Sequence, residues 1–174
     1  RALDANPRVR VLQLTSQGGD TLLAMDMELL VRARALVTYV PRFCVSACAF
    51  VFLGGKERYV GPNAQLGFHA AVGFDDSPAE IARLGEAVKT WMLGRGVAPA
   101  FVDRAVSTPH TTIWVPPPGE LLRAHVITAL TSPATFAAPS FGAGIPALVK
   151  QGLPQNDPLY AATRKLMLAI RKAD

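Results

Sequence analysis

"RVRVLQLTSQGGDTLLAMDMELLVRARALVTYV", residues 8–40, is the stretch that decides the fold. Its first residues alternate and then become apolar, which predicts a strand that enters a sheet. "QGGD" interrupts this strand, and apolar residues at helical spacing over residues 21–36 predict a helix with Asp20 or Thr21 as its N-cap. β-branched and aromatic residues over 36–40 predict a second strand. The order is that of a βαβ unit, which calls for parallel strands and a right-handed crossover.

The segments that follow extend this α/β pattern. We expect a short buried helix over 47–53, then two short strands around the Gly-Pro-Asn turn of "RYVGPNAQLGFHA". Ser77 followed by Pro78 predicts the start of a long helix. "PAFVDRAVS" predicts a short helix, "TTIWVPPP" a strand stopped by prolines, and "GELLRAHVITAL" a helical turn and a last strand. Residues 1–130 are thus interpreted as one α/β domain.

The composition changes at Thr131. Residues 131–174 begin with a segment rich in Pro, Gly, Ala and Ser, which predicts an extended arm. Asp157 and Pro158 then predict the start of a terminal helix with one apolar face. Such an arm and helix can dock on a neighbouring subunit or pack on their own domain, and the sequence leaves both open.

Size and charge exclude several classes of protein. The 174 residues fit one domain with a sizeable core, and 50% apolar against 18% charged residues is a globular balance. The longest apolar run, Ala47–Leu53, is far shorter than the roughly 20 residues of a membrane span. The net charge of +5 is scattered, with a cluster near the C-terminus and no nucleic-acid motif, so we expect no nucleic-acid partner.

The chain contains two cysteines, Cys44 and Cys48, and three histidines. A zinc site would need more ligands than the two cysteines, and no spacing of His and Cys supplies them, so we expect no metal. We also expect no cofactor. The opening "RALDANPRVR" reads like the middle of a helix, and we interpret the chain as a trimmed or processed form from which an export signal could have been removed.

Ser46, between a predicted strand and a predicted helix, is a candidate nucleophile. A helix N-terminus presents free N–H groups, so the N–H of Ala47 would face the oxyanion formed when Ser46 attacks a carbonyl. A second donor should come from "SQGGD" at the end of a neighbouring strand, with Gly19 N–H as the candidate and Gly18 shaping the turn. A serine that only caps the helix is the alternative that these residues leave open.

The general base would be a histidine. His69 ends the strand-like "QLGFH" beside a loop, which is where an α/β hydrolytic site presents its base. His110 lies in a loop, and His125 is expected at a partly buried structural position. We therefore favour His69, against the alternative that it is an ordinary histidine at a strand end.

Taken together, "LQLTSQGGD", "VTYV" and "CVSACAFVFLGGKERYVGPNAQLGFHA" resemble the proteolytic subunit of the Clp protease and the wider Clp/crotonase superfamily, over about residues 9–130. The resemblance is greatest to exported Clp-protease-like bacterial proteins with a Cys-x-Ser-Ala-Cys element. It implies a ββα spiral, assembled into trimers or multiples of trimers. It also implies Ser46 as nucleophile, His69 as base, and Gly19 and Ala47 as oxyanion donors.

The chain departs from this family at the acidic member of the triad. Alignment back from Ile113 and Trp114 implies Ser107 at that position, whereas alignment forward from "AFVDR" implies Ala105. Neither is an acid, and Asp103 lies nearby as an alternative. Ser107, Thr108 or a backbone carbonyl could orient the histidine instead, at some cost in rate.

Cys44 and Cys48 flank Ser46 on both sides. A disulfide between them would fix the backbone of the serine and imply an oxidising compartment, which agrees with the exported relatives. The alternative is two small buried thiols in a cytoplasmic protein. We accordingly expect an exported or periplasmic protein, with the cytoplasm as the alternative.

Three functions remain open at this stage. The first is a serine hydrolase, peptidase-like, that acts on a peptide or acyl substrate through Ser46 and His69. The second is a crotonase-like acyl-CoA enzyme, which uses the same two backbone donors for a thioester enolate. The third is a non-catalytic scaffold of the same fold. Ser46 and His69 favour the first, and for all three we expect a homo-oligomer.

Overall fold

The structure is a computed structural model, which describes residues 3, 6–71, 77–131 and 133–136. By internal contacts the chain divides into two compact units, Arg1–Phe136 and Ala137–Asp174. The second unit lies outside the described residues, and with it the predicted terminal helix and most of the predicted arm.

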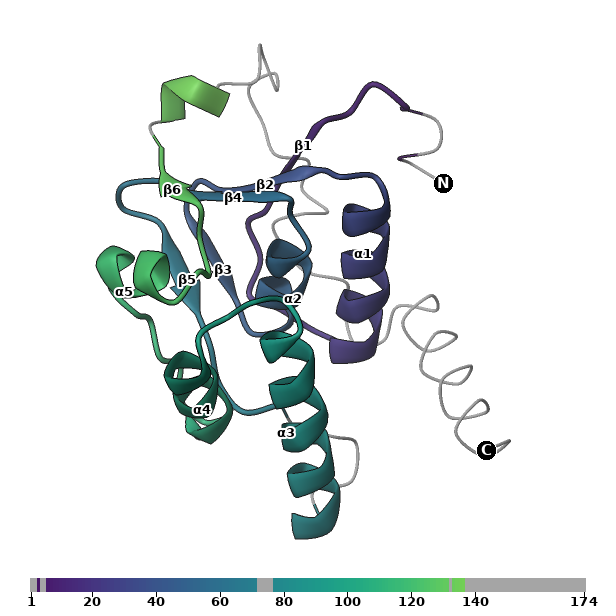
Figure 1. Ribbon diagram of the computed structural model, residues 1–174, viewed down its shortest axis with the longest axis vertical. Coiled ribbons are helices and arrows are strands. Elements are labelled where there is room, and N and C mark those ends of the chain that lie inside the picture. The colour runs from purple at the N-terminus through teal and green to yellow at the C-terminus, as the bar shows by residue number, and fades with distance from the viewer. Residues whose placement is uncertain (1–2, 4–5, 72–76, 132, 137–174) are drawn as a thin grey trace. The chain divides into compact units, whose positions relative to one another are not determined.

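Two parallel sheets organise this unit (Figure 1). The larger sheet has the order β1-β2-β4-β6, formed by Val11–Gln13, Val37–Val40, Glu57–Val60 and Ala129–Leu130. The smaller one pairs β3 (Phe43–Val45) with β5 (Gln65–Gly67), and Val45 lies opposite Gly67. The expected parallel βαβ unit is present, because β1 and β2 pair in parallel on either side of a helix.

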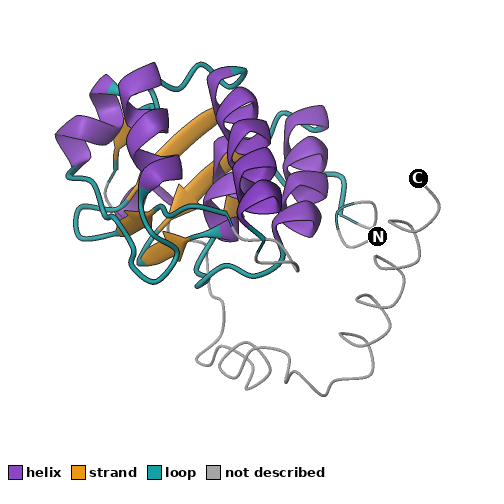
Figure 2. Cartoon of the chain, turned by 90° about the horizontal axis from the view of Figure 1, so that it is seen from below, coloured by secondary structure: helices purple, strands orange, loops and turns teal. Residues whose placement is uncertain are grey.

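Five α-helices accompany the sheets in the described part of the chain: α1 (Thr21–Ala33), α2 (Ala47–Leu53), α3 (Pro78–Leu93), α4 (Pro99–Ser107) and α5 (Pro118–Arg123). The buried helix α2 contacts α1, β2 and β3, so it lies between α1 and the strands, while α3 and α4 pack on each other (Figure 1). Helices lie on both sides of the strands (Figure 2). This is a mixed α/β fold, as the sequence predicts.

The caps follow the sequence closely. Asp20 caps α1, since its carboxylate accepts a hydrogen bond of 2.9 Å from the N–H of Leu23. Ser77 caps α3 in the same way through the N–H of Glu80, with Pro78 at the first helical position. These bonds satisfy donors that a helix start leaves without an intrahelical partner.

The hydrophobic core surrounds α2. The apolar side chains that form this core are buried. Val40, Phe52, Val102 and Val126 are fully buried, and Phe68, Phe101 and Trp114 form an aromatic cluster with ring centroids 4.6 to 6.1 Å apart. One charged side chain is also fully buried. Glu28 accepts two hydrogen bonds, of 2.8 and 2.9 Å, from the guanidinium of Arg95.

Three predicted elements differ from the structure. The helix predicted to reach residue 36 ends at Ala33, because Ala35 adopts a positive φ of 48° that an α-helix cannot contain. "TTIWVPPP" is not a strand but a single antiparallel bridge between Trp114 and Phe68, since proline donates no ladder hydrogen bond and Pro118 already begins α5.

The third difference concerns the start of the predicted arm. Pro133–Phe136 is a 3-10 helix, η1, within the first unit. The ring of Phe136 lies 4.9 Å from that of Tyr39 on β2 and 5.2 Å from that of Tyr59 on β4. Aromatic packing against the sheet therefore holds at least this part of the Pro-rich segment.

Candidate active site

Ser46 forms a sharp turn between β3 and α2. Its backbone has φ 58° and ψ −131°, a conformation that a residue with a side chain adopts only at a cost of about 1–3 kcal/mol. The serine stands at the N-cap position of α2, yet its side chain makes no capping hydrogen bond. The alternative of a simple capping serine thus lacks the bond that would define it.

Several backbone bonds hold this turn in place. The N–H of Ser46 donates to the carbonyl of Gly67 at 3.0 Å, and the N–H of Val45 donates to the carbonyl of Ser16 at 3.1 Å. A disulfide joins Cys44 on β3 to Cys48 in the first turn of α2, with their Cα atoms 5.3 Å apart. Ser46 is midway between the two cysteines, so the strained turn lies inside a covalently closed loop.

The Gly18-Gly19 loop lies against this turn. Gly18 has φ 102° and Gly19 has φ 151°, values that favour glycine. A Cβ at Gly18 would lie 2.7 Å from the Cβ of Ser46 and 2.8 Å from the carbonyl oxygen of Val45, whereas a Cβ at Gly19 would meet nothing within 4 Å. Gly18 thus permits close contact with the serine, and Gly19 faces open space.

The N–H groups of the two glycines also differ. Gly18 N–H donates to the hydroxyl of Ser16 at 3.1 Å. Among the described residues, Gly19 N–H and Ala47 N–H, the two predicted oxyanion donors, have no backbone or side-chain acceptor. Both are therefore available to a ligand.

His69 comes two residues after the end of β5, and Ser46 directly after the end of β3. Because β3 and β5 are paired in parallel, both residues lie at the same edge of this small sheet. The ring Nδ1 of His69 lies 2.7 Å from the carbonyl oxygen of Ala70, and the side chain is partly buried. No hydrogen bond between Ser46 and His69 is present in the described part of the chain. In unliganded enzymes this bond is often long.

The candidates for the third triad member make other contacts. Asp103 forms an ion pair of 2.6 Å with Lys89, and this hydrogen bond raises the pKa of the Lys89 ammonium. The hydroxyl of Ser107 donates to the carbonyl of Arg104 at 3.2 Å, at the exposed end of α4. Ala105 is buried in the core.

The other two histidines, His110 and His125, are exposed. For His125 the predicted partly buried position is wrong. It stands in a turn with φ 58°, directly after Ala124, the C-cap of α5, and its side chain remains accessible to solvent.

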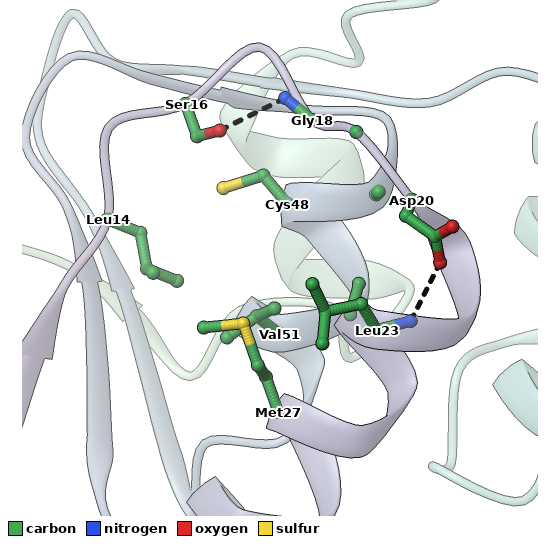
Figure 3. Close-up of a pocket in the computed structure, with 11 residues that line it drawn as sticks. Leu14, Ser16, Gly18, Asp20, Leu23, Met27, Cys48 and Val51 are labelled. Carbon is green, nitrogen blue, oxygen red and sulfur yellow. Dashed lines mark hydrogen bonds between the residues drawn. The ribbon is translucent and has the colours of Figure 1, made fainter. Parts of the chain in front are cut away.

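An apolar pocket of about 180 Å³ opens beside the glycine loop (Figure 3). Leu14, Leu23, Met27 and Val51 form its walls, and both Gly19 and Ala47 line it. Figure 3 shows these four apolar side chains converging below the loop, with the sulfur of Cys48 at one side. No pattern in the sequence indicates this pocket, because its walls come from α1, α2 and the end of β1 and meet only in the folded chain.

Within the described residues there is no group of three or more His, Cys, Asp or Glu side chains that could hold a metal ion. The helices described there include none long and apolar enough to cross a membrane.

No family model matches the chain, and no curated protein matches it. Among solved structures it is similar to ClpP1 from Listeria monocytogenes, with a TM-score of 0.59 and 15% identity over 70% of this chain and 72% of that chain. An asparagine-to-aspartate mutant of the same ClpP1 has a TM-score of 0.57 at the same identity and coverage. At this identity the likeness shows the fold alone. The chain therefore has a ClpP-like α/β fold.

Proposed function

We propose that the chain is a serine hydrolase of the peptidase type, with Ser46 as nucleophile and His69 as general base. The observation that carries this proposal is the strained, non-capping Ser46 at the same sheet edge as His69. A costly backbone conformation persists only where surrounding structure enforces it, and such positions concentrate at functional sites. The ClpP-like fold supports the same reading.

In the proposed reaction, Ser46 Oγ attacks the substrate carbonyl carbon while its proton passes to Nε2 of His69. The electron pair of the C=O bond moves to the carbonyl oxygen, and the N–H groups of Gly19 and Ala47 stabilise that oxyanion. His69 then gives its proton to the leaving group, which departs as the acyl-serine forms. Water then attacks the carbonyl carbon of the acyl-serine while His69 takes one of its protons. His69 returns this proton to Ser46 Oγ as the ester bond breaks, and the acyl group leaves as the free acid.

The apolar pocket suggests which group the substrate carries at the carbonyl. A carbonyl oxygen bound between Gly19 and Ala47 places its substituent beside the pocket that both residues line. Apolar walls such as Met27 suit an aliphatic side chain or a short acyl chain. Leu23→Trp would narrow this pocket and should raise KM for such substrates. Leu22→Trp is the matched control, since Leu22 is similarly exposed on α1 but does not line the pocket.

The direct test of the proposal is labelling by a fluorophosphonate probe. Wild-type protein should be labelled and Ser46→Ala should not, while circular dichroism shows both to be folded. Equal labelling of the two proteins would refute Ser46 as nucleophile. Absence of labelling together with a thermal shift on adding coenzyme A would favour the acyl-CoA enzyme, and absence of both would favour a scaffold.

We further propose an oxidising compartment and a homo-oligomer. The Cys44–Cys48 disulfide supports the first, because such bonds persist outside the reducing cytoplasm. Exposed leucines on α1, such as Leu29, support the second, because apolar surface of this kind is commonly covered by another subunit. A trimer or a multiple of it is the expected assembly.

A further inference from the structure

The partner of the His69 ring indicates which of its two nitrogens carries the proton. Nδ1 lies 2.7 Å from the carbonyl oxygen of Ala70, and a carbonyl oxygen can only accept. Nδ1 must therefore be the donor, so in the neutral ring Nε2 is unprotonated. That is the state in which His69 can take a proton from Ser46.

We infer that the backbone carbonyl of Ala70 takes the positioning role that a carboxylate has in a Ser-His-Asp triad, and that Thr108 keeps this carbonyl in place. The inference rests on the proposed function of Ser46 and His69. The described side chains that could supply a third member make other bonds: the hydroxyls of Ser107 and Thr108 donate to the carbonyl of Arg104, and Asp103 pairs with Lys89.

Ala70, the residue that carries this carbonyl, is held through its own N–H. The N–H of Ala70 donates to the carbonyl of Thr108 at 2.7 Å. On the other side of His69, Phe68 exchanges two hydrogen bonds of 2.9 Å with Trp114. The residues before and after the histidine are therefore both tied to the segment that follows α4.

Thr108 is itself held at the end of α4. Its N–H donates to the carbonyl of Arg104 at 3.1 Å, and its hydroxyl donates to the same carbonyl at 2.8 Å. A continuous series of hydrogen bonds thus leads from α4 through Thr108 and Ala70 to the ring of His69. Thr108 acts through Ala70 and is a positioning residue.

A carbonyl in this place has a chemical consequence. During attack the proton of Ser46 moves to Nε2, and the imidazolium that forms keeps its Nδ1–H bond to Ala70. The carbonyl is a neutral dipole, so it lacks the full opposite charge with which a carboxylate would attract the imidazolium. The geometry of the base is therefore preserved, while the developing positive charge receives less stabilisation than from a carboxylate.

The tautomer can be measured without any activity. In the full-length protein labelled with ¹⁵N-histidine, the ring signals of His69 are assigned by their loss in His69→Gln. At a pH where the ring is neutral, the Nδ1–H tautomer should predominate. A predominant Nε2–H tautomer would overturn the inference.

The role of Thr108 is tested by a pair of variants. Thr108→Val removes the hydroxyl and should lower the labelling rate at Ser46 by about 10-fold, within the roughly 10²-fold that a 1 Å misplacement can cost. Thr108→Ser keeps the hydroxyl and should restore the rate. Thr112→Val is the matched control, because Thr112 makes a similar exposed bond of 3.1 Å, to Pro109.

Three outcomes separate this inference from the proposed function. If Ser107→Ala is labelled more slowly at Ser46 while Thr108→Val is labelled at the wild-type rate, the inference is overturned. The hydroxyl of Ser107 would then be the partner of His69. Equal rates for Thr108→Val and wild type would overturn the role of Thr108. Wild-type protein without any labelling at Ser46 would refute the proposed function, and the tautomer measurement would still decide the state of His69.

Discussion

Gly18→Ala should disable Ser46 while leaving the fold in place. The Cβ added at Gly18 would lie 2.7 Å from the Cβ of Ser46, whereas two carbon atoms pack best at roughly 3.5–4.0 Å. The two residues must therefore separate by about 1 Å. The next contacts are the backbone carbonyl of Val45 at 2.8 Å and the N–H nitrogen of Ala47 at 3.0 Å, so no flexible side chain can give way.

The expected magnitude follows from this displacement. A misplacement of about 1 Å at a reacting group can cost roughly 10²-fold in rate, and both the nucleophile and one oxyanion donor move here. An alanine at φ 102° also adds backbone strain of about 1–3 kcal/mol, which lowers the free energy of unfolding. We expect the second-order rate of fluorophosphonate labelling to fall by about 10²-fold, with a cooperative unfolding transition retained.

Gly19→Ala separates the steric effect from the strain. Gly19 has φ 151°, but a Cβ there meets no atom within 4 Å. This variant should lose some stability yet show a much smaller fall in labelling than Gly18→Ala. If Gly18→Ala is labelled as fast as wild type, the glycine loop does not support the serine, and the site geometry described above is not the reactive one.

Three further predictions concern the rest of the molecule. Intact-mass spectrometry after alkylation under denaturing, non-reducing conditions should show no label on Cys44 or Cys48. Two labels on protein from an oxidising compartment would contradict the Cys44–Cys48 disulfide. Arg95→Met should lower the free energy of unfolding, measured in urea, by about 3–5 kcal/mol, because it leaves the buried carboxylate of Glu28 without its main partner. The double variant with Glu28→Gln should recover part of that loss. An unchanged urea midpoint in Arg95→Met would refute the importance of the pair. Light scattering should give a mass well above the 18.5 kDa of one chain, whereas a monomer at micromolar concentration would contradict the proposed oligomer.

The elements that sequence reasoning predicts best are those with local signals. Asp20 and Ser77 cap their helices because a short polar side chain can reach the free N–H groups of the first turn, which depends on neighbouring residues alone. "PAFVDRAVS" likewise forms α4 over its full length. The sequence predicts the end of α1 too late, since no residue type in this stretch indicates the positive φ of Ala35.

Elements that depend on pairing are harder to predict. "TIWV" has the composition of a strand, yet among the described residues only Trp114 finds a partner, Phe68, because the prolines that follow offer no donors. The apolar pocket is equally invisible in the sequence. The residues of its walls lie on separate elements. Their positions along the chain do not indicate that Leu14 and Val51 line the same pocket.

The candidate site likewise contains features that residue types reveal and features that only the folded chain reveals. The sequence identifies Ser46, His69 and the glycine pair, because their roles depend on residue type. A backbone carbonyl is present at every residue, so no pattern of letters can assign one to the ring of His69. The sequence therefore points to Ser107, Asp103 or Thr108 by name and to a backbone carbonyl only in general, whereas the ring of His69 is bonded to the carbonyl of Ala70, whose side chain carries no polar atom. A missing acid in a ClpP-like fold is thus weak evidence against a working base, since what the base needs is an acceptor at Nδ1 and a fixed ring, and main chain can supply both.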